Sequence, residues 1–96
     1  MILYRGLRVA YPERLLNVER VSTREHNWWS TRPAIALIYA STKGVSEHGG
    51  KQVLLTAECD DDITPTGKIG QVRFGVPGVP HRTLKVLEAE IVESAR

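Results

Sequence analysis

The chain has 96 residues, which is enough for one domain with a single apolar core. Hydrophobic residues make up 42% and charged residues 25%, proportions that are ordinary for a globular protein and exclude a disordered one. The 13 Lys and Arg against 11 Asp and Glu give a formal charge of +2 without a basic block. This weak excess argues against nucleic acid as the partner.

Cysteine content and hydropathy indicate the compartment. A single cysteine, Cys59, cannot form an internal disulfide and leaves a cysteine-based zinc site without enough ligands. The longest apolar run, residues 34–40, is far shorter than the roughly 20 residues of a membrane-spanning helix. The first residues show no charged segment followed by an apolar one, so no signal peptide is visible. These features predict a cytoplasmic protein without a membrane partner.

Two short elements are expected before the tryptophans. Residues 1–9 alternate in polarity and predict a strand, in which Gly6 is expected to break the regular alternation. Residues 11–16 predict one helical turn with Pro12 at its first position. Residues 18–26 are polar and do not favour either type of element.

The apolar run in the middle of the chain predicts the main helix. Ser30 or Thr31 is a candidate N-cap, Pro33 suits the first turn, and Gly44 can end the helix in a left-handed conformation. We therefore expect a helix over 32–43 that is buried on most of its surface. The alternative is a buried strand, because the run also contains isoleucine and tyrosine side chains that favour strands.

Three further strands are expected in the second half. They span residues 52–58, 71–76 and 83–92, and the segments between them are rich in Gly, Pro and Asp. Alternate apolar residues of 71–76 point toward the core, ending with Val76. One helix among four or five short strands predicts a compact α+β fold.

Metal ligands and nucleophiles are poorly represented. His26, His48 and His81 lie far apart, and none has a second ligand at the usual spacing. The three aspartates at 60–62 are consecutive, so their carboxylates point in different directions and predict a solvated strand end. Cys59 lies between two acidic residues, which disfavour a thiolate, so we expect it to be packed and unreactive. No nucleophile elbow or phosphate-binding glycine loop is present.

Two features suggest a ligand site. Arg5 precedes Gly6, so a bidentate guanidinium stands where the backbone permits close approach of a phosphate, ribose or carboxylate. Trp28 and Trp29 precede Ser30 at the mouth of the predicted helix, where indole rings, hydroxyls and free backbone N–H groups can meet a polar ligand. Each feature also has a plainer interpretation, as an exposed arginine or as a core tryptophan followed by a cap.

In this order, the two features resemble the start of the ADP-ribosyltransferase fold. The matching segments are Tyr4-Arg5-Gly6, Trp29-Ser30-Thr31 and the helix 33–40, whose Pro-x-x-Ala-x-x-Tyr-Ala form is typical of the family. The strand at 53–58 and the segment 71–80 extend the resemblance over most of the chain. The resemblance implies one domain over 1–96, with a split β-sheet and an NAD-binding cleft.

The resemblance also implies roles for individual residues. Arg5 would bind the phosphates or ribose of NAD, Ser30 and Thr31 would contact the nicotinamide ribose, and Tyr39 would flank the nicotinamide. The contact of an aromatic ring with the cationic pyridinium ring is worth about 0.5–2 kcal/mol. The implied NAD-binding residues are Tyr4, Arg5, Gly6, Trp29, Ser30, Thr31, Tyr39, Gln71 and Arg73.

The catalytic glutamate of the family has two candidate positions. If the Pro77-Gly78 turn sets the register, the matching triplet is Gln71-Val72-Arg73, and an arginine occupies the place of the glutamate. A cation beside a developing oxocarbenium ion has the wrong sign for catalysis, so this register predicts weak or absent transfer. Glu88 and Glu90 provide an alternative Glu-x-Glu with both carboxylates on one face of a strand.

Three functions follow from these patterns. The first is a minimal transferase that moves ADP-ribose from NAD to a macromolecular target, a protein in our interpretation, with Glu88 or Glu90 as the catalytic group. The second is a non-catalytic member of the fold that binds a partner protein or a nucleotide; small proteins of this kind occur among phage- and plasmid-borne inhibitors of host defence. Its tryptophan and arginines would then anchor an interface. The third is a small α+β domain with no connection to NAD.

Overall fold

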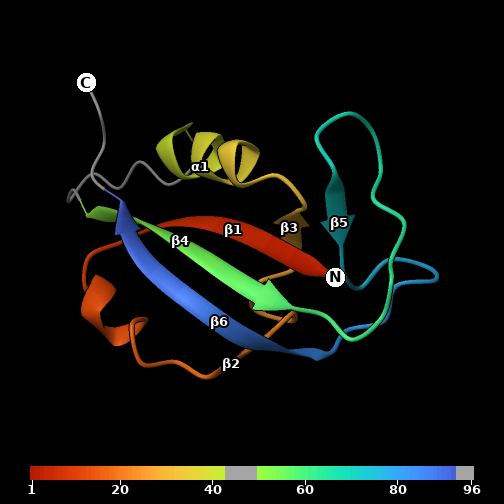
Figure 1. Ribbon diagram of the computed structural model, residues 1–96, viewed down its shortest axis with the longest axis horizontal. Coiled ribbons are helices and arrows are strands. Elements are labelled where there is room, and N and C mark those ends of the chain that lie inside the picture. The colour runs from red at the N-terminus through yellow and green to blue at the C-terminus, as the bar shows by residue number, and fades with distance from the viewer. Residues whose placement is uncertain (43–49, 93–96) are drawn as a thin grey trace.

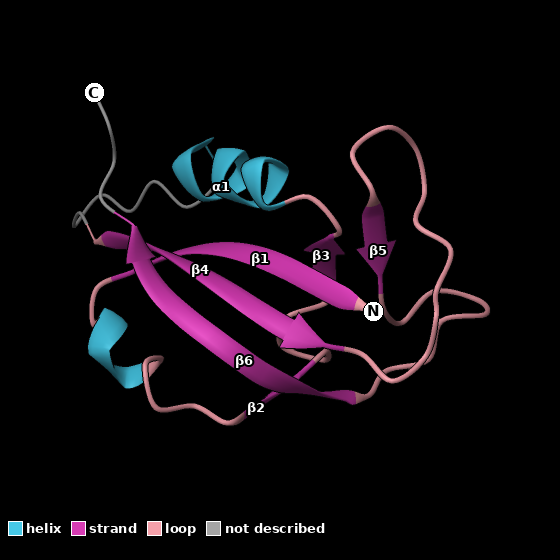
Figure 2. Cartoon of the chain, viewed as in Figure 1, coloured by secondary structure: helices cyan, strands magenta, loops and turns pink. Residues whose placement is uncertain are grey.

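The computed structural model describes residues 1–42 and 50–92, which form one antiparallel sheet and one α-helix (Figures 1 and 2). Six strands are hydrogen-bonded in the order β2-β6-β4-β1-β3-β5. The elements are β1 (Ile2–Val9), the 3-10 helix η1 (Pro12–Arg14), β2 (Arg20–Ser22), β3 (Trp28–Ser30), α1 (Pro33–Thr42), β4 (Lys51–Glu58), β5 (Gln71–Arg73) and β6 (Thr83–Val92).

The predicted α+β class is confirmed, and the longer elements lie where the periodicity placed them. The strand expected at 83–92 is β6, and the run predicted as a helix is α1 and not a strand. The helical turn with Pro12 at its start is η1. The predicted helix end at Gly44 and His48 lie outside the described residues.

The sheet is continuous, whereas a split sheet was expected. All six strands belong to one hydrogen-bonded sheet. The junction between β1 and β3 is nevertheless short, because Tyr4 and Ser30 form its single register pair. In Figure 1, β3 and β5 accordingly run in a different direction from the long strands β1, β4 and β6. The short pair β3–β5 is therefore attached at one edge of a larger four-stranded unit.

The two faces of the sheet have different coverings. Directly opposed residues share a face, and successive residues alternate between faces. Trp28 lies two residues before Ser30, and its ring contacts Tyr39 of α1 with ring centroids 4.2 Å apart. The helix therefore covers the face that carries Trp28, Ser30 and the Ser30 partner Tyr4, and we call this the helix face. The opposite side is the core face.

The main apolar core lies on the core face, away from α1. Its buried members come from all six strands and two loops, and segments around η1 and the loops close over them. Leu3, Val21, Trp29, Val53, Leu55, Ala57, Cys59, Val72, Phe74 and Leu84 form this core.

The expectation of a helix buried on most of its surface is wrong. Of the α1 side chains described, at 33–39, only Ala36 is buried, and Ile38 is 54% exposed. The helix rests on β1, β3 and β4 along one side, and in the described chain no second layer covers its outer side (Figure 1). No helix among the described residues has the length and apolar character needed to cross a bilayer.

The strand expected over 71–76 is shorter than predicted. β5 ends at Arg73, and Gly75 adopts a left-handed φ of 86° that an L-residue adopts only with strain. The Gly75 N–H donates to the Val79 carbonyl (2.7 Å), which closes a turn. Val76 is therefore 39% exposed and does not point into the core as predicted.

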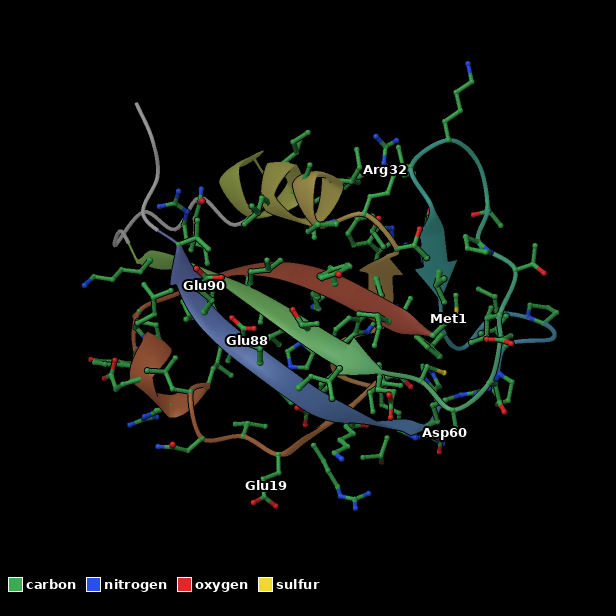
Figure 3. All side chains as sticks on the ribbon, viewed as in Figure 1. Met1, Glu19, Arg32, Asp60, Glu88 and Glu90 are labelled. Atoms are coloured by element: carbon green, nitrogen blue, oxygen red, sulfur yellow. The ribbon has the colours of Figure 1, made fainter. Side chains whose placement is uncertain are left out.

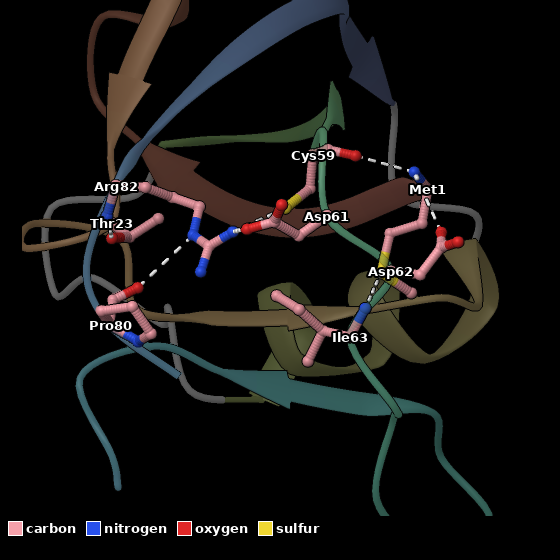
Figure 4. A network of polar contacts seen from close by, with 8 residues as sticks. All are labelled: Met1, Thr23, Cys59, Asp61, Asp62, Ile63, Pro80 and Arg82. Carbon is pink, nitrogen blue, oxygen red and sulfur yellow. Dashed lines mark hydrogen bonds and ion pairs between the residues drawn. The ribbon is translucent and has the colours of Figure 1, made fainter. Parts of the chain in front are cut away.

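Polar contacts join the loop after β4 to the N-terminus and to the segment just before β6 (Figure 4). The Arg82 guanidinium forms an ion pair with the Asp61 carboxylate. The backbone N–H of Arg82 donates to Thr23 Oγ1 (2.8 Å). The Met1 ammonium donates to the Cys59 carbonyl (2.7 Å). Cys59 itself is buried, in agreement with the prediction of a packed thiol.

Candidate functional site

A row of polar residues crosses the helix face. Glu88 lies opposite Thr56, Thr56 opposite Tyr4, Tyr4 opposite Ser30, and Ser30 opposite Gln71. These five residues come from β6, β4, β1, β3 and β5 in turn, and with neighbouring strands about 4.8 Å apart the row spans roughly 19 Å. Four of the five were predicted as site residues, so long-range pairing brings distant parts of the sequence into one line.

The two candidate glutamates lie toward the far end of this row. Glu88 and Glu90 are exposed on the same face of β6 (Figure 3). Three strand spacings, or about 14 Å, separate the backbone of Glu88 from that of Ser30. Gln71, in contrast, lies directly opposite Ser30. The strand that pairs with β3 on its outer side is therefore β5, which contains Arg73. It is not β6, the strand that carries the two glutamates.

The two hydroxyl-bearing residues predicted to meet a ribose form hydrogen bonds within the fold, Ser30 through its side chain and Thr31 through its backbone. Ser30 is buried, its hydroxyl donates to the Ile69 carbonyl (2.7 Å), and its oxygen accepts the Arg32 N–H (3.0 Å) just before α1. The Thr31 N–H donates to the Gly70 carbonyl (3.0 Å). Both residues therefore join the loop before β5 to the segment that leads into the helix. The N-cap position itself is held by Arg32, whose carbonyl accepts the Ala36 N–H (3.2 Å), and not by Ser30 or Thr31 as expected.

The two tryptophans lie on opposite faces. Trp29 is fully buried in the core, and its Nε1–H donates to the His26 carbonyl (2.7 Å). Trp28 is half-buried on the helix face, where its ring meets Tyr39 at an interplanar angle of 40°. We predicted Trp29 as the ligand-contacting ring, but Trp28 is the one that reaches the surface. The alternation within Trp28–Ser30 shows that the two rings cannot share a face.

Two exposed arginines lie on the strand pair that carries Trp28 or directly before the helix that carries Tyr39. Arg73 lies directly opposite Trp28 and therefore leaves the sheet on the same face. Its side chain is exposed and has no hydrogen-bond or ion-pair partner within the described chain. Arg32 is also exposed and donates to the Lys68 carbonyl (2.9 Å) beside β5 (Figure 3). The residues Trp28, Arg32, Tyr39, Gln71 and Arg73 are called the edge patch below.

Arg5 lies on the other side of the sheet. It is opposite Leu55 of the core, and its Nη1 donates to the Trp28 carbonyl (2.8 Å). Burial lowers the pKa of Arg5 below its ordinary value, and no carboxylate pairs with it in the described part of the chain. Its side chain therefore faces away from that of Ser30, and the crevice expected to join the two is not formed. The physical reason is that Tyr4 pairs with Ser30 and shares its face, so the next strand residue, Arg5, takes the opposite face. Gly6 does not interrupt this alternation, because the ladder with β4 runs unbroken along Ile2–Val9.

His26, next to Arg5, supplies a pH-dependent contribution to stability. Burial lowers the pKa of His26 below its ordinary value of 6.5, Arg5 lowers it further, and Glu25 offsets part of the shift. The unfolded chain therefore binds a proton at pH values where the folded chain does not. We expect the free energy of unfolding to fall as the pH drops from 6.5 toward the lowered pKa, and this decrease to be reduced in His26→Gln.

Denaturant unfolding of both proteins between about pH 7.5 and about pH 5 measures this difference. Two parallel pH profiles would contradict the assignment to His26. Arg5→Met, which removes the nearby charge, should raise the His26 pKa when its ring protons are followed by NMR.

Metal ligands do not gather anywhere in residues 1–42 and 50–92. No group of three or more His, Cys, Asp or Glu side chains in these segments is placed to hold a metal ion. His81 shares a hydrogen bond with Thr23 Oγ1 (3.1 Å), and His26 lies beside Arg5. The aspartates at 60–62 lie in the exposed segment after β4, as predicted for a solvated strand end.

The geometry thus offers an aromatic and cationic patch at one sheet edge and a pair of exposed glutamates near the other. Comparisons of the chain with protein-family models, with curated proteins and with solved structures found no match.

Proposed function

We propose that this chain is an ADP-ribosyltransferase-like protein that binds NAD at the edge patch and has lost efficient transfer of ADP-ribose. The observation that carries the proposal is the register of β3 with β5, which sets Arg73 directly opposite the half-exposed Trp28. The proposal keeps NAD as the ligand that the sequence resemblance implies. It also follows the resemblance in treating 71–73 as the counterpart of the family's Glu-containing strand.

The chemistry of the edge patch fits a dinucleotide. Trp28 and Tyr39 offer aromatic surface to a base or to the pyridinium ring, and a cationic ring gains about 0.5–2 kcal/mol there. Arg73 and Arg32 carry guanidinium groups, which bind phosphate oxygens in bidentate fashion. Gln71 adds an amide that can donate to and accept from ribose hydroxyls. Flat rings flanked by two cations therefore match the two rings and the pyrophosphate of NAD.

The same arrangement disfavours the transfer step. Loss of nicotinamide leaves positive charge on the ribose, and a nearby carboxylate is needed to stabilise it. If 71–73 is the counterpart of the family's glutamate-containing strand, Arg73 puts a positive charge where that carboxylate would stand. Glu88 has the required sign but stands three strands from Ser30. The residues therefore support nucleotide binding better than they support catalysis.

Calorimetric titration with NAD tests the proposal. We expect saturable binding by the wild-type protein, weakened at least about tenfold in Arg73→Ala, because a hydrogen bond to a charged group is worth about 1.5–3 kcal/mol. Trp28→Ala should weaken binding to a similar extent through the lost ring contact. Arg20→Ala is the matched control, since Arg20 is an exposed arginine in β2 at the opposite edge of the sheet, and it should bind like the wild type.

A parallel assay of nicotinamide release separates the alternatives. The wild-type protein should release nicotinamide no faster than buffer does. Release that disappears in Glu88→Gln would instead show that the protein cleaves NAD and that Glu88 acts in the cleavage. Absence of saturable NAD binding, in a protein shown to be folded by circular dichroism, would remove the link to NAD.

A further inference from the structure

The outer edge of β6 is left open over half its length. β2 pairs with β6 only at 83–85, and the Val86 N–H donates to the Glu19 carbonyl (2.8 Å) one residue further on. Over 87–92, the described residues supply a strand partner on one side only, which is β4. Backbone N–H and C=O groups on such an open edge can pair with an added strand.

A groove runs beside this open edge. It has a volume of about 290 Å³ and is lined by residues 16–19 on one side and 86–89 on the other. Leu16 and Leu87 stand at the groove with 44% and 45% of their surfaces exposed, although both are large and apolar. The groove therefore combines an unpaired backbone with a mostly polar lining in which two leucine side chains are partly exposed.

Charge decides which kind of strand can occupy the edge. Glu88 and Glu90 are exposed on one face of β6 (Figure 3), and Glu19 is among the residues that line the groove. If a second copy of the chain paired antiparallel about Ala89, each Glu88 would lie opposite a Glu90. Like charges directly opposite each other destabilise a ladder. Lysine or arginine at these positions would instead form cross-strand ion pairs.

We propose that the free edge of β6 binds an extended segment of a partner protein with Lys or Arg at alternate positions, which adds a seventh strand to the sheet. Its basic side chains pair with Glu88 and Glu90, and an apolar side chain between them packs against Leu16 and Leu87. The main-chain hydrogen bonds supply affinity, and the alternate side chains supply selectivity. This surface and the edge patch lie toward opposite edges of the sheet, so the two proposals stand independently.

The experiment uses two acetylated and amidated peptides of about eight residues, one alternating Lys with Val and one alternating Glu with Val. Binding is measured at low salt by calorimetry, and amide hydrogen exchange is followed by NMR. We expect the Lys peptide to bind, to slow exchange within 87–92 and to leave exchange in β5 unchanged. Added salt should weaken this binding, because exposed ion pairs are screened.

Charge reversal provides the decisive comparison. Glu88→Lys/Glu90→Lys should weaken binding of the Lys peptide at least about tenfold and should create binding of the Glu peptide. The control Glu25→Lys/Asp60→Lys makes the same change in net charge at exposed positions outside β6 and should bind the Lys peptide within about threefold of wild type.

Three outcomes would overturn the proposal. The first is equal weakening by the control variant, which would indicate attraction by net charge alone. The second is protection of amides outside 87–92. The third is a wild-type dimer in sedimentation experiments with 87–92 already protected, which would assign the edge to a second copy of the chain.

Discussion

Replacing Trp29 by alanine is expected to lower the free energy of unfolding by about 3–5 kcal/mol, the usual cost of removing a buried tryptophan or phenylalanine side chain. Trp29 has no exposed surface, is the largest side chain of the core, and donates a hydrogen bond to the His26 carbonyl. A domain of this size is stable by only about 5–15 kcal/mol, so the variant should lose a large part of its stability. Urea unfolding followed by circular dichroism measures the effect.

The neighbouring tryptophan is the matched control for this prediction. Trp28 has the same side chain but is half-buried on the helix face, so Trp28→Ala should cost roughly half as much or less. Trp29→Phe retains most of the buried ring and loses the indole donor, and an intermediate cost of about 1–2 kcal/mol is expected. Equal costs for Trp28→Ala and Trp29→Ala would show that the two rings are not divided between the faces as described.

The second large effect is expected at Gly70. A Cβ at this position would overlap with Thr31 Oγ1, and the backbone has a left-handed φ of 63°. Gly70→Ala should therefore cost about 2–4 kcal/mol, from backbone strain and overpacking together. Gly67 has nearly the same φ, 66°, and open space where the Cβ would stand, so Gly67→Ala should cost only the strain, about 1–2 kcal/mol.

A double-mutant cycle identifies the cause of the difference between the two glycines. Thr31→Ala removes Oγ1 and leaves the backbone hydrogen bond from Thr31 to the Gly70 carbonyl in place. Gly70→Ala should then cost about 1–2 kcal/mol less in the Thr31→Ala background than in the wild type. An identical cost in both backgrounds would show that the close approach of the β5 loop to the helix start does not determine the stability.

Local sequence patterns predicted the elements whose periodicity runs over many residues. The ten-residue β6 and the apolar run of α1 carry enough repeats for the pattern to be read without tertiary information. The expected burial of the helix was wrong because a run that is apolar all round does not show how many layers cover it. β5 was overextended because Val76 continues the alternation while Gly75 turns the backbone away.

The faces of the sheet could not be predicted in the same way. Arg5 and Ser30 belong to one family pattern in the sequence, but their faces depend on the pairing of Tyr4 with Ser30, residues 26 positions apart. A shift of one residue in that pairing would exchange every side chain between the faces. The row from Glu88 to Gln71 likewise depends on four long-range registers, none of which a local pattern contains.

One irregularity in β6 did leave a trace in the sequence. The register with β4 shifts between Thr56 and Ala57, which pair with Glu88 and Val86 and leave Leu87 as an extra residue. The apolar residues packed on the core accordingly change from even numbers (84 and 86) to odd numbers (89 and 91) at this point. That change of phase was the available signal for a bulge, and without the bulge Glu88 would lie opposite Leu55 in the core.

The bulge at Leu87 also bears on self-assembly into fibrils. Stacks of identical strands grow best from straight, flat edges, and a bulge increases local twist where it interrupts the ladder. In this protein the extra residue, Leu87, lies just beyond the segment of β6 that pairs with β2. The unpaired edge of β6 therefore begins with a distorted backbone. The protein therefore keeps an accessible strand edge and carries a built-in obstacle to amyloid growth.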